Sequence, residues 1–188
     1  MSETTTRDAK LIQYLNEAYG KEKELETALQ AHIGMAERDA YKKRLKDHLK
    51  ETKNHARQLE RRIKKLGGKA EAGPLPEAAQ NVVEAAQSAT HKAAALAQGQ
   101  VHAIRGTGAA EKQLKNAKTE LTDEHEEIAN YTALETFAEA VGDDETAKLA
   151  RGIRREEERM AKFLSGQITV LSKQVAREEI PAAERKKR

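Results

Sequence analysis

The stretch DHLKETKNHARQLERRIKKL, residues 47–66, decides how the rest of this sequence is interpreted. Its large apolar residues recur at steps of three, four and seven, which is the spacing of one face of an α-helix. Two histidines, His48 and His55, interrupt that apolar face. Glu51 lies one helical turn before His55, so both side chains leave the helix on the same side. A carboxylate and an imidazole arranged in this way suit a metal site inside a helical bundle.

The amino-acid composition favours long helices and excludes two kinds of cysteine chemistry. Charged residues make up 35% of the 188 residues, aromatic residues only 3%, and tryptophan is absent. Such a composition is typical of long helices rather than of sheets. Cysteine is also absent, so disulfides and thiolate metal sites are excluded. Any metal must therefore be held by carboxylate and imidazole, which favours iron, manganese or zinc.

The charge balance and the hydropathy indicate a soluble, cytoplasmic protein. The formal net charge is +3, from 34 basic and 31 acidic residues, which is only weak support for an anionic partner. No stretch is long and apolar enough to span a bilayer. The first ten residues, MSETTTRDAK, lack the apolar segment of a secretory signal.

The same periodicity predicts four long helices in all. They are expected over about residues 6–35, 39–66, 109–141 and 144–175. Polar residues that can cap helix starts are Thr5, Thr6 or Asp8 for the first helix, Asp39 for the second, and Asp143 or Asp144 for the fourth. The glycine pair at residues 67–68 and Gly142 are expected to end the second and third helices.

A long connection separates the second helix from the third. Residues 69–108 contain Pro74 and Pro76, followed by an Ala- and Gln-rich segment that is expected to form one or two short helices. Short turns make each helical hairpin antiparallel, and the long crossover permits an up-down-down-up arrangement. We therefore expect an all-α, ferritin-like four-helix bundle over residues 1–178, with an extra helical crossover, and a basic disordered tail over residues 179–188.

Each predicted helix carries a glutamate near the middle of its apolar face. A carboxylate in such a position is costly unless it is paired, protonated or bound to a metal. Dimetal carboxylate bundles carry one glutamate on each of two helices and Glu-x-x-His on each of the other two. By this comparison the pattern predicts ligands for two divalent ions at Glu22, Glu51, His55, Glu124 and Glu157.

Two departures from that pattern leave a simpler interpretation open. His55 follows Glu51 by four residues rather than three, although both spacings share one helix face. Met160 stands three residues after Glu157, where a second histidine is expected, so one nitrogen ligand is missing. His48 is interpreted as a polar core or interface group rather than as a ligand. Any one of the glutamates, taken alone, is better explained as a boundary residue with its carboxylate in water.

Four blocks of this sequence together resemble a known family. They are YLNEAYGKEKEL (residues 14–25), HLKETKNHARQLE (48–60), EHEEIANYTALETFAEAVGDDETAKL (124–149) and REEERMAKFL (155–164). In this order they carry Tyr-x-x-Glu-Lys, His-Leu-x-Glu-Thr, Glu-His-x-Glu-Ile-x-x-Tyr and a run of three glutamates. The sequence thereby resembles the bacterial ferritin-like stress proteins of the YciE/YciF type.

This resemblance implies a ferritin-like bundle, usually a homodimer, with a dinuclear iron or manganese centre and a link to stress. It also implies that His55 is a ligand, because bacterioferritin-like helices carry a ligating histidine in a similar motif. The resemblance carries metal ligation over to Glu22, Glu51, Glu124, Glu127 and Glu157.

Two functions from different classes follow. The first is a non-haem dimetal carboxylate protein of oxidative or general stress, ferroxidase- or peroxidase-like, holding two iron or manganese ions. Whether it is an enzyme stays open, and no catalytic residue is assigned. The alternative is a metal-free bundle that binds nucleic acid or another polyanion through a basic helix face and the tail at residues 185–188. The basic face comprises Lys46, Lys50, Lys53, Arg57, Arg61 and Lys64.

Overall fold

The computed structural model describes residues 5–72 and 108–185, which form four long α-helices and one short 3-10 helix. They are α1 (Thr6–Met35), α2 (Asp39–Lys65), α4 (Ala109–Ala140), α5 (Asp144–Glu179) and the 3-10 helix η1 (Ala182–Glu184). No strand occurs in these two ranges, so the expected all-α class is confirmed. Residues 73–107, where the helical crossover is expected, lie outside the described residues.

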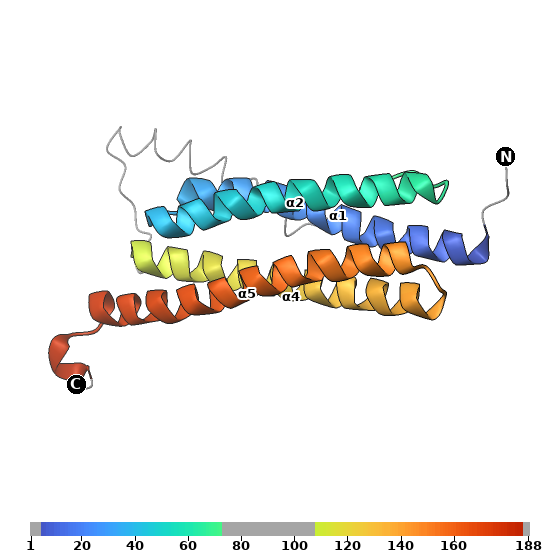
Figure 1. Ribbon diagram of the computed structural model, residues 1–188. Helices are drawn as coiled ribbons and strands as arrows, with labels where there is room; N and C mark the ends of the chain where they lie inside the picture. Colours follow the sequence, from blue (N-terminus) through green and yellow to red (C-terminus); the bar gives the residue numbers. More distant parts are fainter. Residues whose placement is uncertain (1–4, 73–107, 186–188) are drawn as a thin grey trace.

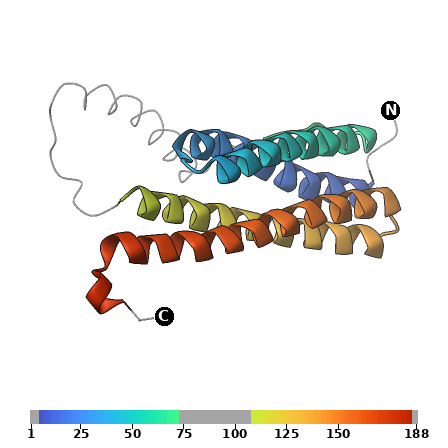
Figure 2. The ribbon, with the colours of Figure 1, turned by 60° about the vertical axis from the view of Figure 1, so that its left-hand side comes forward.

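The helices form two antiparallel hairpins that lie side by side (Figures 1 and 2). Within each hairpin the chain turns sharply, between α1 and α2 and between α4 and α5. Across the hairpins, α1 packs against α4 and α2 packs against α5. The helix directions are therefore up, down, down and up, and the ferritin-like four-helix bundle is confirmed.

Local chemistry sets most of the helix ends. The side chains of Thr5 and Asp143 each accept a hydrogen bond from the backbone N–H three residues on, so both are N-caps as expected. Asp39 is the first residue of α2 rather than its cap. Gly67 and Gly142 have φ of +84° and +72°, a conformation that favours glycine and ends α2 and α4. The last helix, α5, continues to Glu179 and is followed by η1 in the described part of the tail.

Three apolar clusters fill the interior of the bundle, and a layer of polar side chains separates the two larger ones. One cluster contains Leu25, Leu29, Tyr41, Leu45, Met160 and Leu164. The other contains Leu15, Leu59, Ile63, Tyr131, Leu134 and Ile153. On each of the four helices at least one buried glutamate or histidine falls between the residues of these two clusters. With charged groups spaced along every helix, none in the described parts of the chain is long and apolar enough to cross a membrane.

The buried face of α4 follows the apolar periodicity only in part. Periodicity points to seven residues, of which Ala117, Tyr131, Leu134 and Ala138 are buried. The other three, Leu114, Leu121 and Ile128, are only partly buried. The buried face instead carries a polar series that includes Gln113, Glu120, Glu124 and Glu127. The leucines lie one residue away from that series, which places them at the boundary with neighbouring helices because successive helical residues are about 100° apart.

Candidate metal centre

Six titratable side chains from all four helices meet in the polar layer. They come from the same level of the bundle because each helix places them between its two apolar segments. No more than 1% of any of these residues is exposed. The polar layer consists of Glu22 from α1, His48 and His55 from α2, Glu124 and Glu127 from α4, and Glu157 from α5.

One group of side chains surrounds the inner ring nitrogen of His55. Its Nδ1 lies 2.9 Å from Oε1 of Glu157 and 3.3 Å from Oε1 of Glu22. The outer nitrogen, Nε2, lies 2.8 Å from Oε2 of Glu156 at the edge of the bundle. His55 therefore faces two buried carboxylates on one side and a carboxylate that is about one-third exposed on the other.

A second group surrounds His48 in the same manner. Its Nε2 lies 2.9 Å from Oε1 of Glu124 and 3.6 Å from Oε2 of Glu157. The outer nitrogen, Nδ1, lies 3.1 Å from Oε2 of Glu51. The guanidinium of Arg44 donates to that same oxygen at 2.9 Å, which holds Glu51 in place.

Glu157 joins the two groups, because one of its oxygens faces His55 and the other faces His48. Glu22, His55 and Glu157 form one set of three donors whose atoms lie within 4.8 Å of one another. His48, Glu124 and Glu157 form the other set. The arrangement thus offers two adjacent positions for cations, with Glu157 shared between them.

Many of the oxygen and nitrogen atoms in this layer that could ligate a metal lack a hydrogen-bond partner among the described residues. The contacts of His55 Nδ1 are close, but they are not aligned as hydrogen bonds. Buried polar atoms are normally satisfied, so such a concentration in one place indicates that something else completes the site. The unsatisfied atoms are Oε2 of Glu22, Nδ1 of His55, Oε2 of Glu124, and both carboxylate oxygens of Glu127 and of Glu157.

Burial and mutual contact shift the pKa of most of these groups. Burial raises the pKa of Glu22 and, further still, that of Glu127, whose neighbouring carboxylates add to the effect. Burial also raises the pKa of Glu124 to about 8, although its contact with His48 opposes the change. Without a cation, these carboxylates therefore hold protons more tightly than exposed ones do.

The pKa values of the two histidines are also raised, although burial alone would lower them. Burial disfavours an imidazolium, yet hydrogen bonds to Glu124 and Glu51 raise the pKa of His48 to about 10. Contacts with Glu157 and Glu22 raise the pKa of His55 to about 11 in the same way. In the metal-free protein the positive charge that balances the carboxylates is therefore carried by protons.

The structure brings five of the six sequence-predicted ligands into the polar layer and leaves one at its edge. The residue at the edge is Glu51, whose side chain is one-third exposed and contacts Arg44 and the outer nitrogen of His48. Glu156 has the equivalent place beside His55. The five residues inside the layer are Glu22, His55, Glu124, Glu127 and Glu157.

His48, which the sequence interprets as a polar core group, brings a second buried imidazole into the layer, although not at the position where a second histidine is expected. Met160, at the expected position of that histidine, is fully buried in an apolar cluster. His48 precedes His55 by seven residues, which is two helical turns, so both rings lie on one face of α2. That spacing was visible in the sequence, whereas the Glu-x-x-His template assigns only one histidine to each helix.

A second buried polar cluster lies one turn from the layer on α4 and was not predicted either. The hydroxyl of Tyr41 donates to Oε2 of Glu120 at 2.5 Å. Nδ1 of His32 lies 2.9 Å from the other oxygen of that carboxylate. All three residues are buried, so this cluster ties α1, α2 and α4 together beside the layer.

Comparison with known families identifies the relatives of this chain. The family described as "Domain of unknown function (DUF892)" matches residues 6–177. A search of curated proteins returns no match. Because the family match spans most of the chain, it establishes membership of the family.

Solved structures show the same fold at low sequence identity. A protein from Xanthomonas campestris pv. campestris has a TM-score of 0.67 and 23% identity, covering 93% of this chain and 100% of its own. The E. coli stress protein YciF has a TM-score of 0.64 and 20% identity, covering 90% and 98%. The Desulfovibrio desulfuricans bacterioferritin, described with a diiron site, has a TM-score of 0.63 and 19% identity, covering 92% and 86%. The family match and the likeness to YciF confirm the resemblance that the four sequence blocks predicted, and the chain belongs to the DUF892 family.

Proposed function

We propose that this protein binds two divalent iron or manganese ions in the polar layer of its bundle. The observation that carries the proposal is the set of seven buried donor atoms, from five residues, that lack a hydrogen-bond partner within the described residues. Leaving so many polar atoms buried and unpaired is costly, and cations placed between them would satisfy all of these atoms together.

The distances between donor atoms support one ion in each group. Two ligand atoms that each lie about 2.0–2.2 Å from one metal ion, at roughly tetrahedral or octahedral angles, lie about 3 Å from each other. The contacts around His55 are 2.9 and 3.3 Å, and those around His48 are 2.9 and 3.6 Å. Glu157 would be shared by the two ions, and Glu127 would supply further oxygens.

The charges of the layer also support two divalent ions. Glu22, Glu124, Glu127 and Glu157 carry four negative charges when they are ionised, and two divalent cations balance them while both histidines stay neutral. A neutral imidazole is the form that ligates metals, and binding must release the protons that now occupy these groups. Carboxylate and imidazole donors with no thiolate suit iron or manganese.

The partly exposed carboxylates Glu51 and Glu156 fit a supporting role. Metal-binding histidines usually donate their second N–H to a carboxylate, which orients the ring and raises its basicity. Glu51 would do this for His48, and Glu156 for His55. We therefore place Glu51 beside a ligand rather than among the ligands, in contrast to the assignment that the sequence favours.

We further propose a role in oxidative or general stress, of ferroxidase or peroxidase type. Two such ions, when bound, supply the redox chemistry with which dimetal carboxylate proteins react with oxygen or peroxide. The residues of this chain would bind and orient the ions, and the apolar clusters on both sides would exclude water. The hydroxyl of Tyr131 donates to Glu22 and would hold that carboxylate in position. We also propose the homodimer that the family resemblance implies, which analytical ultracentrifugation would test.

Metal content provides the direct test. The protein is purified without chelator, loaded anaerobically with iron(II) or manganese(II), desalted and measured by mass spectrometry. We expect about two ions per chain, as in two-metal sites, and loss of both in Glu157→Gln. Glu120→Gln is the matched control, because it neutralises a fully buried carboxylate outside the layer. Wild-type protein that retains no metal after loading would rule the proposal out.

The basic face of α2 supports a second candidate function, binding of a polyanion such as nucleic acid. Its side chains are exposed or partly exposed along one side of the helix. Three of its lysines, however, pair with carboxylates, which reduces the charge available to a partner. These pairs are Lys50 with Asp47, Lys53 with Glu26, and Lys64 with Glu60. Binding of this kind must weaken steeply as salt rises, so a DNA titration at two salt concentrations tests it.

A further inference from the structure

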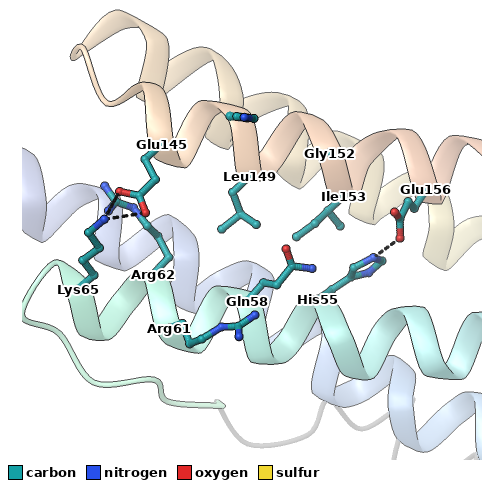
Figure 3. A pocket seen from close by; sticks show the side chains of 11 residues that line it. His55, Gln58, Arg61, Arg62, Lys65, Glu145, Leu149, Gly152, Ile153 and Glu156 are labelled. Carbon is teal, nitrogen blue, oxygen red and sulfur yellow. Dashed lines mark hydrogen bonds and ion pairs between the residues drawn. The ribbon is translucent and has the colours of Figure 1, made fainter.

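A groove between α2 and α5 leads from the surface to the outer nitrogen of His55. Its volume of about 520 Å³ lies in the range of about 300–1,000 Å³ that is usual for small-molecule sites. Side chains from both helices point into it, and the contact between His55 and Glu156 lies at one end of it (Figure 3).

The pairing of the two helices sets two cations at the same level of the groove. His55 contacts Glu156 near one end, and Lys65 contacts Glu145 near the other, so the helices run antiparallel. By that register, Arg61 of α2 stands level with Lys148 of α5, and both residues line the groove and are exposed.

These two cations are the ones whose charge is available to a ligand. Arg62 forms an ion pair with Asp143, and both Arg62 and Lys65 form ion pairs with Glu145. Arg61 and Lys148, by contrast, make no ion pair with any residue in the ranges 5–72 and 108–185. A negatively charged group lying between them would therefore meet uncompensated positive charge from both helices.

Below these cations the groove is apolar and open. Leu149 and Ile153 form its floor on α5. Gly152 lies between them in the sequence and also lines the groove, and a Cβ added there would meet no atom within 4 Å, so a larger side chain fits at this position without a clash. The amide of Gln58 lies further along the groove, toward His55. The lining thus changes from basic, through apolar, to hydrogen-bonding.

We propose that this groove binds a small organic anion with an apolar body. The acidic group would lie between Arg61 and Lys148, and the apolar body would lie over Leu149 and Ile153. The far end of the ligand would then contact Gln58 and Glu156, beside the imidazole of His55. This site does not require a bound metal, so it goes beyond the proposed dimetal function and can be tested separately from it.

Binding of 8-anilinonaphthalene-1-sulfonate, an aromatic sulfonate, to chelator-treated full-length protein provides the test. We expect saturable binding at one site, with a rise in fluorescence. N-phenyl-1-naphthylamine, the neutral analogue that lacks the sulfonate, should bind at least about tenfold more weakly, because it cannot use the paired cations.

Three variants separate the groove from other surfaces. Gly152→Leu fills the floor, changes no charge and replaces a poor helix former by a good one, so it should abolish binding in a folded protein. Arg61→Glu with Lys148→Glu should weaken binding at least about tenfold. Lys46→Glu with Lys162→Glu is the matched control, because these exposed cations also lie one on α2 and one on α5 but do not line the groove.

The proposal is overturned if the Gly152→Leu variant binds the sulfonate as the wild type does. It is also overturned if the two double variants lose binding equally, since that would show attraction by net charge alone. Circular dichroism of every variant confirms that the helices are intact. Because these titrations use metal-free protein, their failure would leave the metal-content result unaffected.

Discussion

Glu51 holds the outer ring nitrogen of His48: its Oε2 lies 3.1 Å from Nδ1, while Nε2 of the same ring faces the polar layer. One side of the imidazole is thus fixed by a carboxylate at the edge of the bundle, and the other side is left to the buried donors. Removing the outer contact should therefore change how the ring is oriented without removing a buried metal ligand.

Glu51→Gln should weaken metal binding without changing the number of ions bound. The amide keeps the shape of the side chain but not its charge, so His48 is oriented less firmly and its basicity falls. Changes of this kind cost about 10–100-fold in metal affinity. Competition with a chelator of known affinity measures the effect. If the loaded variant instead loses an ion at saturating metal, Glu51 is a ligand and our placement of it is wrong.

Each histidine should serve one ion. His48→Ala and His55→Ala are each expected to leave about one ion per chain, because the two groups of donors meet only through Glu157. Glu157→Gln should lose both. Mass spectrometry of the desalted, loaded variants distinguishes these outcomes. Full metal content in His48→Ala would show that its ring is only a buried polar group that pairs with Glu124.

The metal-free bundle should lose stability as pH rises from about 5 to 9. The pKa of Glu124 is raised to about 8 in the folded protein, so its contribution is present below its unfolded pKa of 4.5 and is lost as pH approaches 8. The pKa values of His48 and His55 are raised to about 10 and 11, so their contribution is complete below 6.5 and declines as pH rises toward those values. All three changes have the same sign.

Thermal unfolding of chelator-treated protein across that pH range measures this trend. Glu51 does not affect it, because its lowered pKa of about 2 alters stability only as pH falls below about 4.5. Metal-loaded protein should behave oppositely, since deprotonation favours metal binding. An unfolding temperature of the metal-free protein that increases with pH would contradict the assigned protonation of the layer.

Tyr41→Phe should destabilise the bundle without reducing its metal content. The change removes the hydroxyl that donates to Glu120 and leaves a buried carboxylate oxygen without that partner. Such a loss costs about 1–3 kcal/mol, which urea unfolding resolves. Tyr14→Phe is the control, because that ring is only partly buried and packs edge-on against Phe137. Loss of metal from Tyr41→Phe would show that the cluster with His32 and Glu120 is coupled to the polar layer.

The sequence by itself determined the class, the helices and most of their ends. Apolar periodicity is a local property of each helix, so it located all four without knowledge of their packing. Thr5, Asp143, Gly67 and Gly142 act through backbone groups within a few residues, and they were therefore readable in advance. The central position of Glu22 and Glu157 on otherwise apolar faces likewise marked the level at which polar groups meet.

Only the tertiary structure decided which polar residues meet at that level. Within α2, His48, Glu51 and His55 all point toward the same general side, and helix periodicity does not distinguish an inner group from one at the edge. The rotation of α2 against α5 turns both rings inward and leaves Glu51 beside Arg44, because that packing buries the apolar residues on either side. Rotation of a helix about its axis is set by contacts with residues distant in the sequence. The inward position of His48, the cluster at Glu120 and the groove at Gly152 therefore became visible only in the folded bundle.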